Sequence, residues 1–324
     1  MNTKWNEFTI SAIGDVIGGG TPSTKHDEYY NDEIAWITPK DLSNFKGRYI
    51  SRGERSISQK GYDNSSAQMM PAGTVLFSSR APIGYVAIAK NELCTNQGFK
   101  SVVPHPEVCD SEFLYYLLCY RKHDIEAIAS GTTFMEVSGT ALKNFVVRMP
   151  DISTQKKIAS VLSSLDKRIE GNNLINHNLE EQAKALYDQI WDNYDSGTWS
   201  SAKAEDLFDI SIGKTPPRKE SQWFSENDND IVWVSIADMG QSGCFISNSS
   251  EYLTPDAVSK FNVKRVPAGA ILLSFKLTVG RVAITGCELT TNEAIAHFRM
   301  EDSTIREYLY FYLKHFRVPL FIQG

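Results

Sequence analysis

The feature that most constrains this chain is an internal duplication. The segment PAGTVLFSSRAPIGYVAIAKNELCTNQGF at 71–99 returns as PAGAILLSFKLTVGRVAITGCELTTNEAI at 267–295, with 13 of 29 positions identical and no gap. The loop GGGTPS at 18–23 is likewise repeated as IGKTPP at 212–217. The offset stays between 194 and 197 residues, whereas a solenoid repeats every 20–50 residues or so. The chain therefore carries one domain twice.

Each copy is predicted to fold as a small mixed sheet with helices, which makes the fold class α+β. A loop rich in glycine and proline leads to a short apolar strand around Trp36 or Trp233. Two further strands are expected after the Pro-Ala-Gly turn, with Gly84 or Gly280 between them. These strands cover 75–78 and 86–89 in the first copy, and 271–274 and 282–285 in the second. A helix is predicted from 111 to about 129.

A long helix is predicted between the copies, in the segment 153–191. Apolar side chains follow each other there at alternating steps of four and three, which is a heptad seam. The seam positions are Ile158, Leu162, Leu165, Ile169, Leu179, Leu186 and Ile190. Ser153 or Thr154 is expected to cap the first turn. About 38 residues at 1.5 Å each give a rod of roughly 57 Å, long enough to hold two domains apart.

This seam needs a partner, because a lone helix leaves its apolar stripe in water. Asn172 and Asn176 lie on the seam, and they either set the register with a partner helix or mark a kink or hydrated point near Gly171. The predicted domains are residues 1–150, a helical spacer 151–196, and residues 197–324.

Charge and composition exclude several classes of protein. The net charge is −6 and no segment is globally basic, so a nucleic-acid ligand has to meet a local cationic face. No apolar run approaches the roughly 18 residues of a membrane span, which predicts a cytoplasmic protein without membrane contact. The five cysteines form no CxxC pair, so free thiols and no metal site are expected. Without a phosphate loop, an HExxH site or an amino-methylation motif, no cofactor and no intrinsic catalysis are expected.

Four sequence features together resemble the specificity subunit of type I restriction-modification systems. They are the twice-used W-[IV]-[TS]-x-x-D stretch, the twice-used PAG…LxS…G…VA stretch with its TN[QE] end, the passage SGTT…LKNFVVRMPDISTQKKIASVLSSLDKRI at 130–169, and the two modules on either side of the helix. The resemblance covers essentially the whole chain.

The resemblance implies that each module is a target-recognition domain reading one half of a split, asymmetric site on double-stranded DNA. It also implies that helices set the gap between the halves and that two modification (methyltransferase) subunits dock on the helical region. Restriction (translocase/nuclease) subunits would join through them, and the chain itself would be non-catalytic. Shared residues would then build one scaffold twice, and divergent residues would let the two scaffolds read different bases.

The chain departs from the family pattern in two places. Family members carry a second helix after the second module, packed antiparallel on the first, whereas here LFIQG ends the sequence and Gly324 matches about Gly131. This predicts either a shortened form or a central helix that pairs with another chain, including self-association. The family also carries Glu-Gln where the helix starts, and Thr154-Gln155 stands here.

Side chains that read DNA are expected where the two copies differ. Arg or Lys bonds guanine, Asn or Gln bonds adenine, and cations sit on phosphates. The stretch KGRYISRGERSISQK at 46–60 is the clearest cationic segment, and it is either a solvated surface loop or a phosphate contact. The predicted DNA contacts are Thr38, Lys40, Lys46, Arg48, Arg52, Arg55, Lys60, Arg80, Tyr85 and Gln97 in the first copy, and Arg218, Lys219, Ser235, Lys276, Arg281 and Glu293 in the second.

Some polar positions survive the duplication and favour a structural role. Asp41 and Asp238 are kept, which favours a scaffold hydrogen bond for both carboxylates. Asn96 and Asn292 are also kept, and we expect each to tie a turn together. Where matched polar residues differ, altered base reading and neutral surface drift predict the same pattern.

Two rival functions remain open from the sequence. A DNA-independent scaffold would bind protein partners through the helical stripe and would show no salt-dependent binding to duplex DNA. The specificity subunit of a related system, in which methylation and cleavage share one polypeptide, would carry the same motifs.

Overall fold

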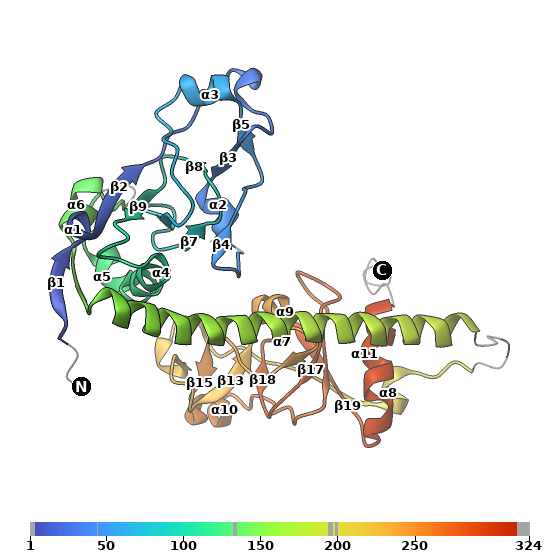
Figure 1. Ribbon diagram of the computed structural model, residues 1–324. Helices are drawn as coiled ribbons and strands as arrows, with labels where there is room; N and C mark the ends of the chain where they lie inside the picture. Colours follow the sequence, from blue (N-terminus) through green and yellow to red (C-terminus); the bar gives the residue numbers. More distant parts are fainter. Residues whose placement is uncertain (1–3, 44, 132–134, 194–196, 198–199, 316–324) are drawn as a thin grey trace. The chain divides into compact units, whose positions relative to one another are not determined.

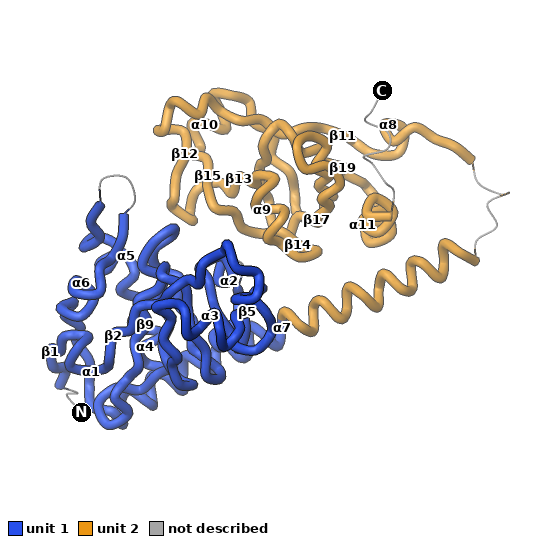
Figure 2. Tube along the Cα trace, turned by 90° about the horizontal axis from the view of Figure 1, so that it is seen from above, with its two compact units in different colours: residues 1–172 blue, residues 173–324 orange. Residues whose placement is uncertain are grey.

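The chain forms two compact units, residues 1–172 and 173–324 (Figure 2). A computed structural model describes residues 4–43, 45–131, 135–193, 197 and 200–315. The C-terminal LFIQG and Gly324, on which the predicted loss of a second helix rests, lie outside the described residues. Each unit contains one copy of the duplicated segment and one half of the central helix.

The first unit is built on a five-stranded mixed sheet. Its strands run in the order β2 (Gly14–Gly18), β9 (Lys100–Pro104), β6 (Val75–Phe77), β7 (Val86–Ala89) and β4 (Tyr49–Ile50). Strands β4 and β7 are parallel, and the other neighbours are antiparallel. A smaller sheet has the order β5 (Ser56–Ile57), β3 (Ile34–Ile37) and β8 (Cys94–Thr95), with β3 parallel to β8. A separate antiparallel ribbon joins β1 (Asn6–Thr9) to β10 (Val146–Met149).

The second unit repeats both sheets with matching strand order and senses, and its smaller sheet has one additional edge strand, β12. The larger sheet runs β11 (Asp209–Ile212), β19 (Ile295–Arg299), β16 (Ile271–Ser274), β17 (Val282–Thr285) and β14 (Phe245–Ile246). The smaller sheet runs β12 (Phe224–Ser225), β15 (Tyr252–Leu253), β13 (Ile231–Val234) and β18 (Thr290–Thr291). In both units the parallel pairs are the matched ones, which confirms the predicted duplication at the level of topology.

The central strands β6 and β16 are buried on both faces of their sheets. Val75 and Phe77 point into one core with the helices, and Leu76 between them points into a second core beneath the small sheet. In the second unit Ile271 faces the helical core and Leu272 faces the other one. This period-two alternation is why the short segments after each Pro-Ala-Gly turn form strands.

Short helices connect the strands (Figure 1). In the first unit they are α1 (Ile10–Ile13), α2 (Pro39–Leu42), α3 (Gln59–Asp63), α4 (Ser111–Tyr120), α5 (Lys122–Ala127) and α6 (Gly139–Asn144), with a 3₁₀ turn at Asp27–Tyr29. In the second unit they are α8 (Ala204–Leu207), α9 (Ile236–Gln241), α10 (Pro255–Lys260) and α11 (Arg306–His315), with 3₁₀ turns at Ser221–Trp223 and Ser303–Ile305. Within the described ranges, the structure contains no helix long and apolar enough to traverse a bilayer.

The predicted single helix at 111–129 is wrong, because the structure has two helices that are separated at Arg121. The change of direction allows Ile125 in α5 to be fully buried in the core that Leu118 in α4 also enters. Tyr120, at the end of α4, is 83% exposed. The helix breaks at Arg121 because the apolar residues of both α4 and α5 are buried in this core. No residue in the sequence signals this break.

The predicted central helix is confirmed as α7 (Ile152–Asn193), the long green helix of Figure 1. Its first turn is capped by Asp151, not by the predicted Ser153 or Thr154. The Asp151 carboxylate accepts from Thr154 N at 3.0 Å and from the Thr154 hydroxyl at 2.9 Å. These hydrogen bonds, the backbone one first, hold the pKa of Asp151 below its ordinary value. Asp151 has this role because it immediately precedes the first helical residue.

Candidate nucleic-acid interface

In the first unit a glycine-rich loop is pinned against the end of strand β8. Gly20 N donates to Thr95 O at 2.9 Å, and the buried Trp36 donates its Nε1–H to Gly20 O at 3.0 Å. A Cβ on Gly19 would lie 2.0 Å from Asn96 O, which no side chain tolerates. The loop therefore needs glycine because its backbone lies directly on the Thr95–Asn96 backbone.

The second unit builds the same contact with matched residues. Lys214 N donates to Thr291 O at 2.9 Å, and Trp233 Nε1 donates to Lys214 O at 3.3 Å. A Cβ on Gly213 would lie 2.2 Å from Asn292 O. The residues that the two copies share in these motifs thus form one local structure twice.

This local structure fixes one exposed polar side chain in each unit. The Thr21 hydroxyl donates to Gln97 Oε1, and the Thr215 hydroxyl donates to Glu293 Oε2. Both acceptor residues are exposed. We call residues 19–21 with 95–97, and residues 213–215 with 291–293, the reader corner of each module. The corner holds the same position in both copies and presents a different chemical group there.

The predicted turn role of the conserved asparagines is confirmed. Asn96 Oδ1 accepts from Gly98 N at 2.9 Å, and Asn292 Oδ1 accepts from Ala294 N at 3.1 Å. Each asparagine side chain closes the turn that carries the next residue. It thereby fixes the backbone from which Gln97 or Glu293 extends.

The carboxylate at the second reader corner is held in its ionised form. The hydrogen bond from Thr215 lowers the pKa of Glu293 below its ordinary value, and a backbone hydrogen bond acts in the same direction. The positive charges of Lys276 and Arg218 lower this pKa further. Glu293 therefore presents an acceptor that carries negative charge at neutral pH.

A second loop lies beside each reader corner. In the first unit Ser79 N donates to Gly98 O at 2.7 Å, and in the second Phe275 N donates to Ala294 O at 3.0 Å. These bonds join the loops 79–84 and 275–280 to the turns that carry the reader-corner side chains. Arg80 and Lys276 occupy matched positions on these loops.

The two loop cations differ in what they contact. Arg80 lies 3.6 Å from Glu136 as an ion pair and is half-buried. Lys276 is exposed, and the next residue, Leu277, is 92% exposed with a φ of +61°. Of this pair, Lys276 is the more accessible to a phosphate.

The acidic residues kept in both copies make the predicted scaffold hydrogen bonds, and these form helix capping boxes. Asp41 Oδ2 accepts from Thr38 N and from the Thr38 hydroxyl, each at 2.7 Å. Asp238 Oδ2 accepts from Ser235 N at 2.8 Å and from the Ser235 hydroxyl at 2.6 Å. The Thr38 and Ser235 hydroxyls, which we predicted as DNA contacts, are therefore engaged in starting α2 and α9.

Most of the exposed cations of the stretch 46–60, and Lys40 before it, have acidic or aromatic neighbours. These contacts are Lys40 to Glu54 at 2.6 Å, Arg52 to Asp32 at 3.3 Å, Lys60 to Glu28 at 3.2 Å, and Arg55 over the Tyr30 ring at 4.2 Å. Lys46 is exposed on the same stretch. Because exposed ion pairs of this kind contribute about 0–1 kcal/mol, a phosphate can replace the acidic partner at little cost.

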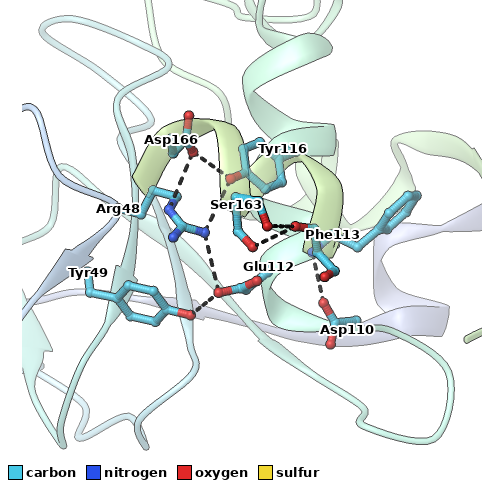
Figure 3. Close-up of polar contacts among 10 residues, drawn as sticks. Arg48, Tyr49, Asp110, Glu112, Phe113, Tyr116, Ser163 and Asp166 are labelled. Atoms are coloured by element: carbon cyan, nitrogen blue, oxygen red, sulfur yellow. Dashed lines mark hydrogen bonds and ion pairs between the residues drawn. The ribbon is translucent and has the colours of Figure 1, made fainter. Parts of the chain in front are cut away.

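The predicted DNA contact at Arg48 is corrected by the structure. Its side chain is 6% exposed, and Nη1 lies 3.3 Å from Glu112 Oε1 and 3.2 Å from the Tyr116 hydroxyl (Figure 3). Its Nε lies 3.4 Å from Asp166 Oδ2. Tyr49 donates to the same Glu112 carboxylate at 2.6 Å. Because the guanidinium is buried among these groups, it joins the module to α7 and does not face a phosphate.

The matched residues directly after these loops, Tyr85 and Arg281, have structural contacts as well. Tyr85 is half-buried against the core beneath the small sheet. Arg281 is half-buried, and its Nη1 donates to Ile236 O. Both positions therefore help to hold the loop in place.

In the second unit Arg218 and Lys219 are exposed, and their role as phosphate contacts stays a prediction. Arg218 pairs with Glu251 at 2.7 Å and lies over the Trp233 ring at 4.5 Å. The positive charge of Arg218 also contributes to lowering the pKa of Glu293.

Most of the predicted seam of α7 is uncovered. Ile158 and Leu162 are half-buried, and the other five positions are 50–62% exposed: Leu165, Ile169, Leu179, Leu186 and Ile190. Val161, Leu174 and Ile175, which the seam did not include, are 57–69% exposed. An apolar stripe thus remains on the described part of this helix.

Other positions of α7 attach the helix to the modules, and the sequence did not reveal them. Gln155 is fully buried, donating to Val108 O and Pro150 O at 2.9 Å each. In the second unit Glu180 accepts from the Tyr310 hydroxyl and from Lys314 Nζ at 2.6 Å each. Thr21 and Thr215 were also missed, although their survival in both copies was a usable signal.

In the described part of the chain, no three His, Cys, Asp or Glu side chains are grouped so as to hold a metal ion.

Comparisons with known proteins agree with this architecture. The family model described as "Type I restriction modification DNA specificity domain" matches residues 2–181 and 196–318. The type I restriction enzyme MjaIX specificity subunit of Methanocaldococcus jannaschii is 35% identical over 93% of this chain and 73% of its own length. The HindI specificity subunit of Haemophilus influenzae is 22% identical over 95% of this chain and 79% of its own length.

A solved structure has a similar fold. The type I restriction-modification S subunit of M. genitalium superposes with a TM-score of 0.54 at 17% identity, covering 97% of this chain and 77% of that one. With two matching modules, a continuous helix between them and a family match over nearly the whole length, the chain belongs to the family of type I restriction-modification DNA specificity subunits.

Proposed function

We propose that this chain reads a bipartite, asymmetric DNA target and that each module contacts one half of it. The observation that supports this most is the paired reader corner, in which shared residues hold a side chain that differs between the copies. A DNA-independent scaffold gives no reason to anchor an exposed polar group so firmly in both modules.

Local cations are proposed to hold the DNA phosphates. In the first module these are Lys40, Lys46, Arg52, Arg55, Lys60 and Arg80, and in the second they are Arg218, Lys219 and Lys276. They meet the requirement for a local cationic face on a chain whose net charge is −6. Binding should therefore weaken steeply as salt concentration rises, because phosphate contacts release counterions.

We further propose that α7 connects recognition to the rest of the enzyme. Its exposed apolar stripe fits the docking of two modification subunits, and restriction subunits would join through these. Self-association through the same stripe is the second use that its exposure supports. The domain division 1–150, 151–196 and 197–324 belongs to this proposal, as does a non-catalytic role in the cytoplasm.

The test is to co-purify the chain with its cognate modification subunits and to map methylated adenines across a genome. A split motif with two fixed halves and a constant gap is the expected result. Replacing residues 1–150 with the corresponding module of another specificity subunit should change one half of the motif and leave the other. A motif that is continuous, or one that changes in both halves, contradicts modular reading.

A further inference from the structure

The two reader corners present opposite hydrogen-bonding groups from the same position. In the first module Thr21 occupies one lone pair of Gln97 Oε1, so the amide keeps both N–H donors and one further acceptor site. In the second module Thr215 occupies Glu293 Oε2, so the carboxylate offers acceptor oxygens without a donor.

In both modules the side chain of Gln97 or Glu293 is held in one orientation by the residues around it. A surface Gln or Glu ordinarily samples several rotamers, and fixing one costs conformational entropy. Here the threonine hydroxyl holds each side chain, the glycine contact holds the threonine loop, and a buried tryptophan holds the loop carbonyl. Pre-organised groups of this kind are suited to specific reading, because less order has to be imposed on binding.

An ionised carboxylate on a surface that faces a polyanion is unfavourable unless it gains a hydrogen bond there. The pKa of Glu293 is lowered by its partners, so it remains charged at neutral pH. Phosphates offer no hydrogen-bond donor, whereas the exocyclic amine of cytosine does, and Glu accepts from it in the major groove. Gln pairs with adenine through N6 and N7, which uses one acceptor and one donor.

We propose that Gln97 and Glu293 are specificity-determining residues that each read one base of the half-site contacted by their module, Gln97 an adenine and Glu293 a cytosine. This inference rests on the proposed function and adds to it the positions and the chemistry of reading. The threonines act as positioning residues, since they fix which atoms of the side chain face the base.

The test is an isosteric exchange at each corner, followed by mapping the methylated motif of the assembled enzyme. Glu293→Gln keeps an oxygen for Thr215, and it should change one base of the second half-site from cytosine to adenine. Gln97→Glu should make the reverse change in the first half-site. Each variant is the matched control for the other, because each should leave the opposite half unchanged.

A second pair of variants separates positioning from reading. Thr215→Val and Thr21→Val remove the hydroxyl and keep the shape, so the preferred base should stay and discrimination against the other bases should fall about tenfold. A merely structural role for the threonines would lower the unfolding midpoint and leave discrimination intact.

The outcomes distinguish a failure of the proposed function from a failure of the base assignment at Gln97 and Glu293. A wild-type assembly that modifies no split motif contradicts the proposed function itself. A wild-type split motif that persists unchanged in both exchange variants overturns the reading assignment alone, as does a change in the opposite half. If an exchange variant modifies no site, competition binding with duplexes carrying each base at that pair is measured, and wild-type preferences there also overturn the assignment.

Discussion

Arg48 Nε lies 3.4 Å from Asp166 Oδ2, and this ion pair joins the start of strand β4 to the helix α7. The second module has Cys244 at the matched position, because Cys244 O accepts from Ile284 N as Arg48 O accepts from Ile88 N. There the helix is held instead by Glu180, which accepts from Tyr310 and Lys314. The two modules therefore use different polar contacts to attach to one helix.

Removing the Arg48 guanidinium should destabilise the first unit. Arg48→Met leaves Glu112 and Asp166 without their cation in a partly buried site, which we expect to cost about 2–4 kcal/mol of unfolding free energy. Chemical denaturation of the full chain measures it. Arg55→Ala is the matched control, since Arg55 is exposed over a tyrosine ring and should cost less than about 1 kcal/mol. Equal costs for the two variants would contradict the burial argument.

The second unit should lose stability in mild acid because of His297. This side chain is fully buried on β19, its ring nitrogens meet Thr291 and Ser211 hydroxyls, and burial lowers its pKa to about 4. The unfolded chain protonates at its ordinary pKa near 6.5, so it binds more protons than the folded chain between these values.

The stability contributed by neutral His297 is thus complete above pH 6.5 and is lost as pH falls towards 4, by about 3 kcal/mol. His297→Gln should flatten the dependence of unfolding free energy on pH within that window. If the unfolding free energy of the variant depends on pH as steeply as that of the wild type, groups other than His297 cause the dependence.

Charging the exposed stripe of α7 should release partners without unfolding the chain. Leu179 and Leu186 are 57% and 62% exposed, so Leu179→Lys with Leu186→Lys leaves the cores intact. We expect the double variant to keep its unfolding midpoint and to lose co-purification with the modification subunits, because lysines cannot fill an apolar interface. Leu277→Lys, at a site 92% exposed on another surface, is the control. If the double variant still co-purifies stoichiometrically with the modification subunits, the stripe is not their docking site.

The length of α7 is predicted to set the gap in the target. Repeating residues 168–174 once adds a heptad, which advances the helix by about 10 Å. At 3.4 Å per base pair, the gap should widen by about three base pairs while both halves stay the same. Gly171→Ala, where a Cβ meets no atom within 4 Å, changes the sequence of the segment without its length and should leave the gap as it is. A constant gap after the insertion would exclude the helix as the spacer.

Much of the fold could be predicted because it depends on short-range patterns of apolar residues. The strands that follow each Pro-Ala-Gly turn alternate between two cores, and α7 carries a heptad repeat along its length. The roles of Asp41, Asp238, Asn96 and Asn292 were predictable because survival in two diverged copies marks a scaffold function. The break at Arg121 was not predictable, since it depends on the burial of Ile125 in the same core that Leu118 enters.

The sequence by itself determined that one α+β module occurs twice, with a continuous helix between the copies, because periodicity and duplication are properties of neighbouring residues. Only the tertiary structure decided which charges and polar groups face outward. Arg48 lies in a cationic stretch and yet is buried by Glu112 and Asp166, and Gln97 is fixed by Thr21, 76 residues away. Such pairings depend on how the sheets bring distant segments together, and a linear pattern of charges does not contain that information.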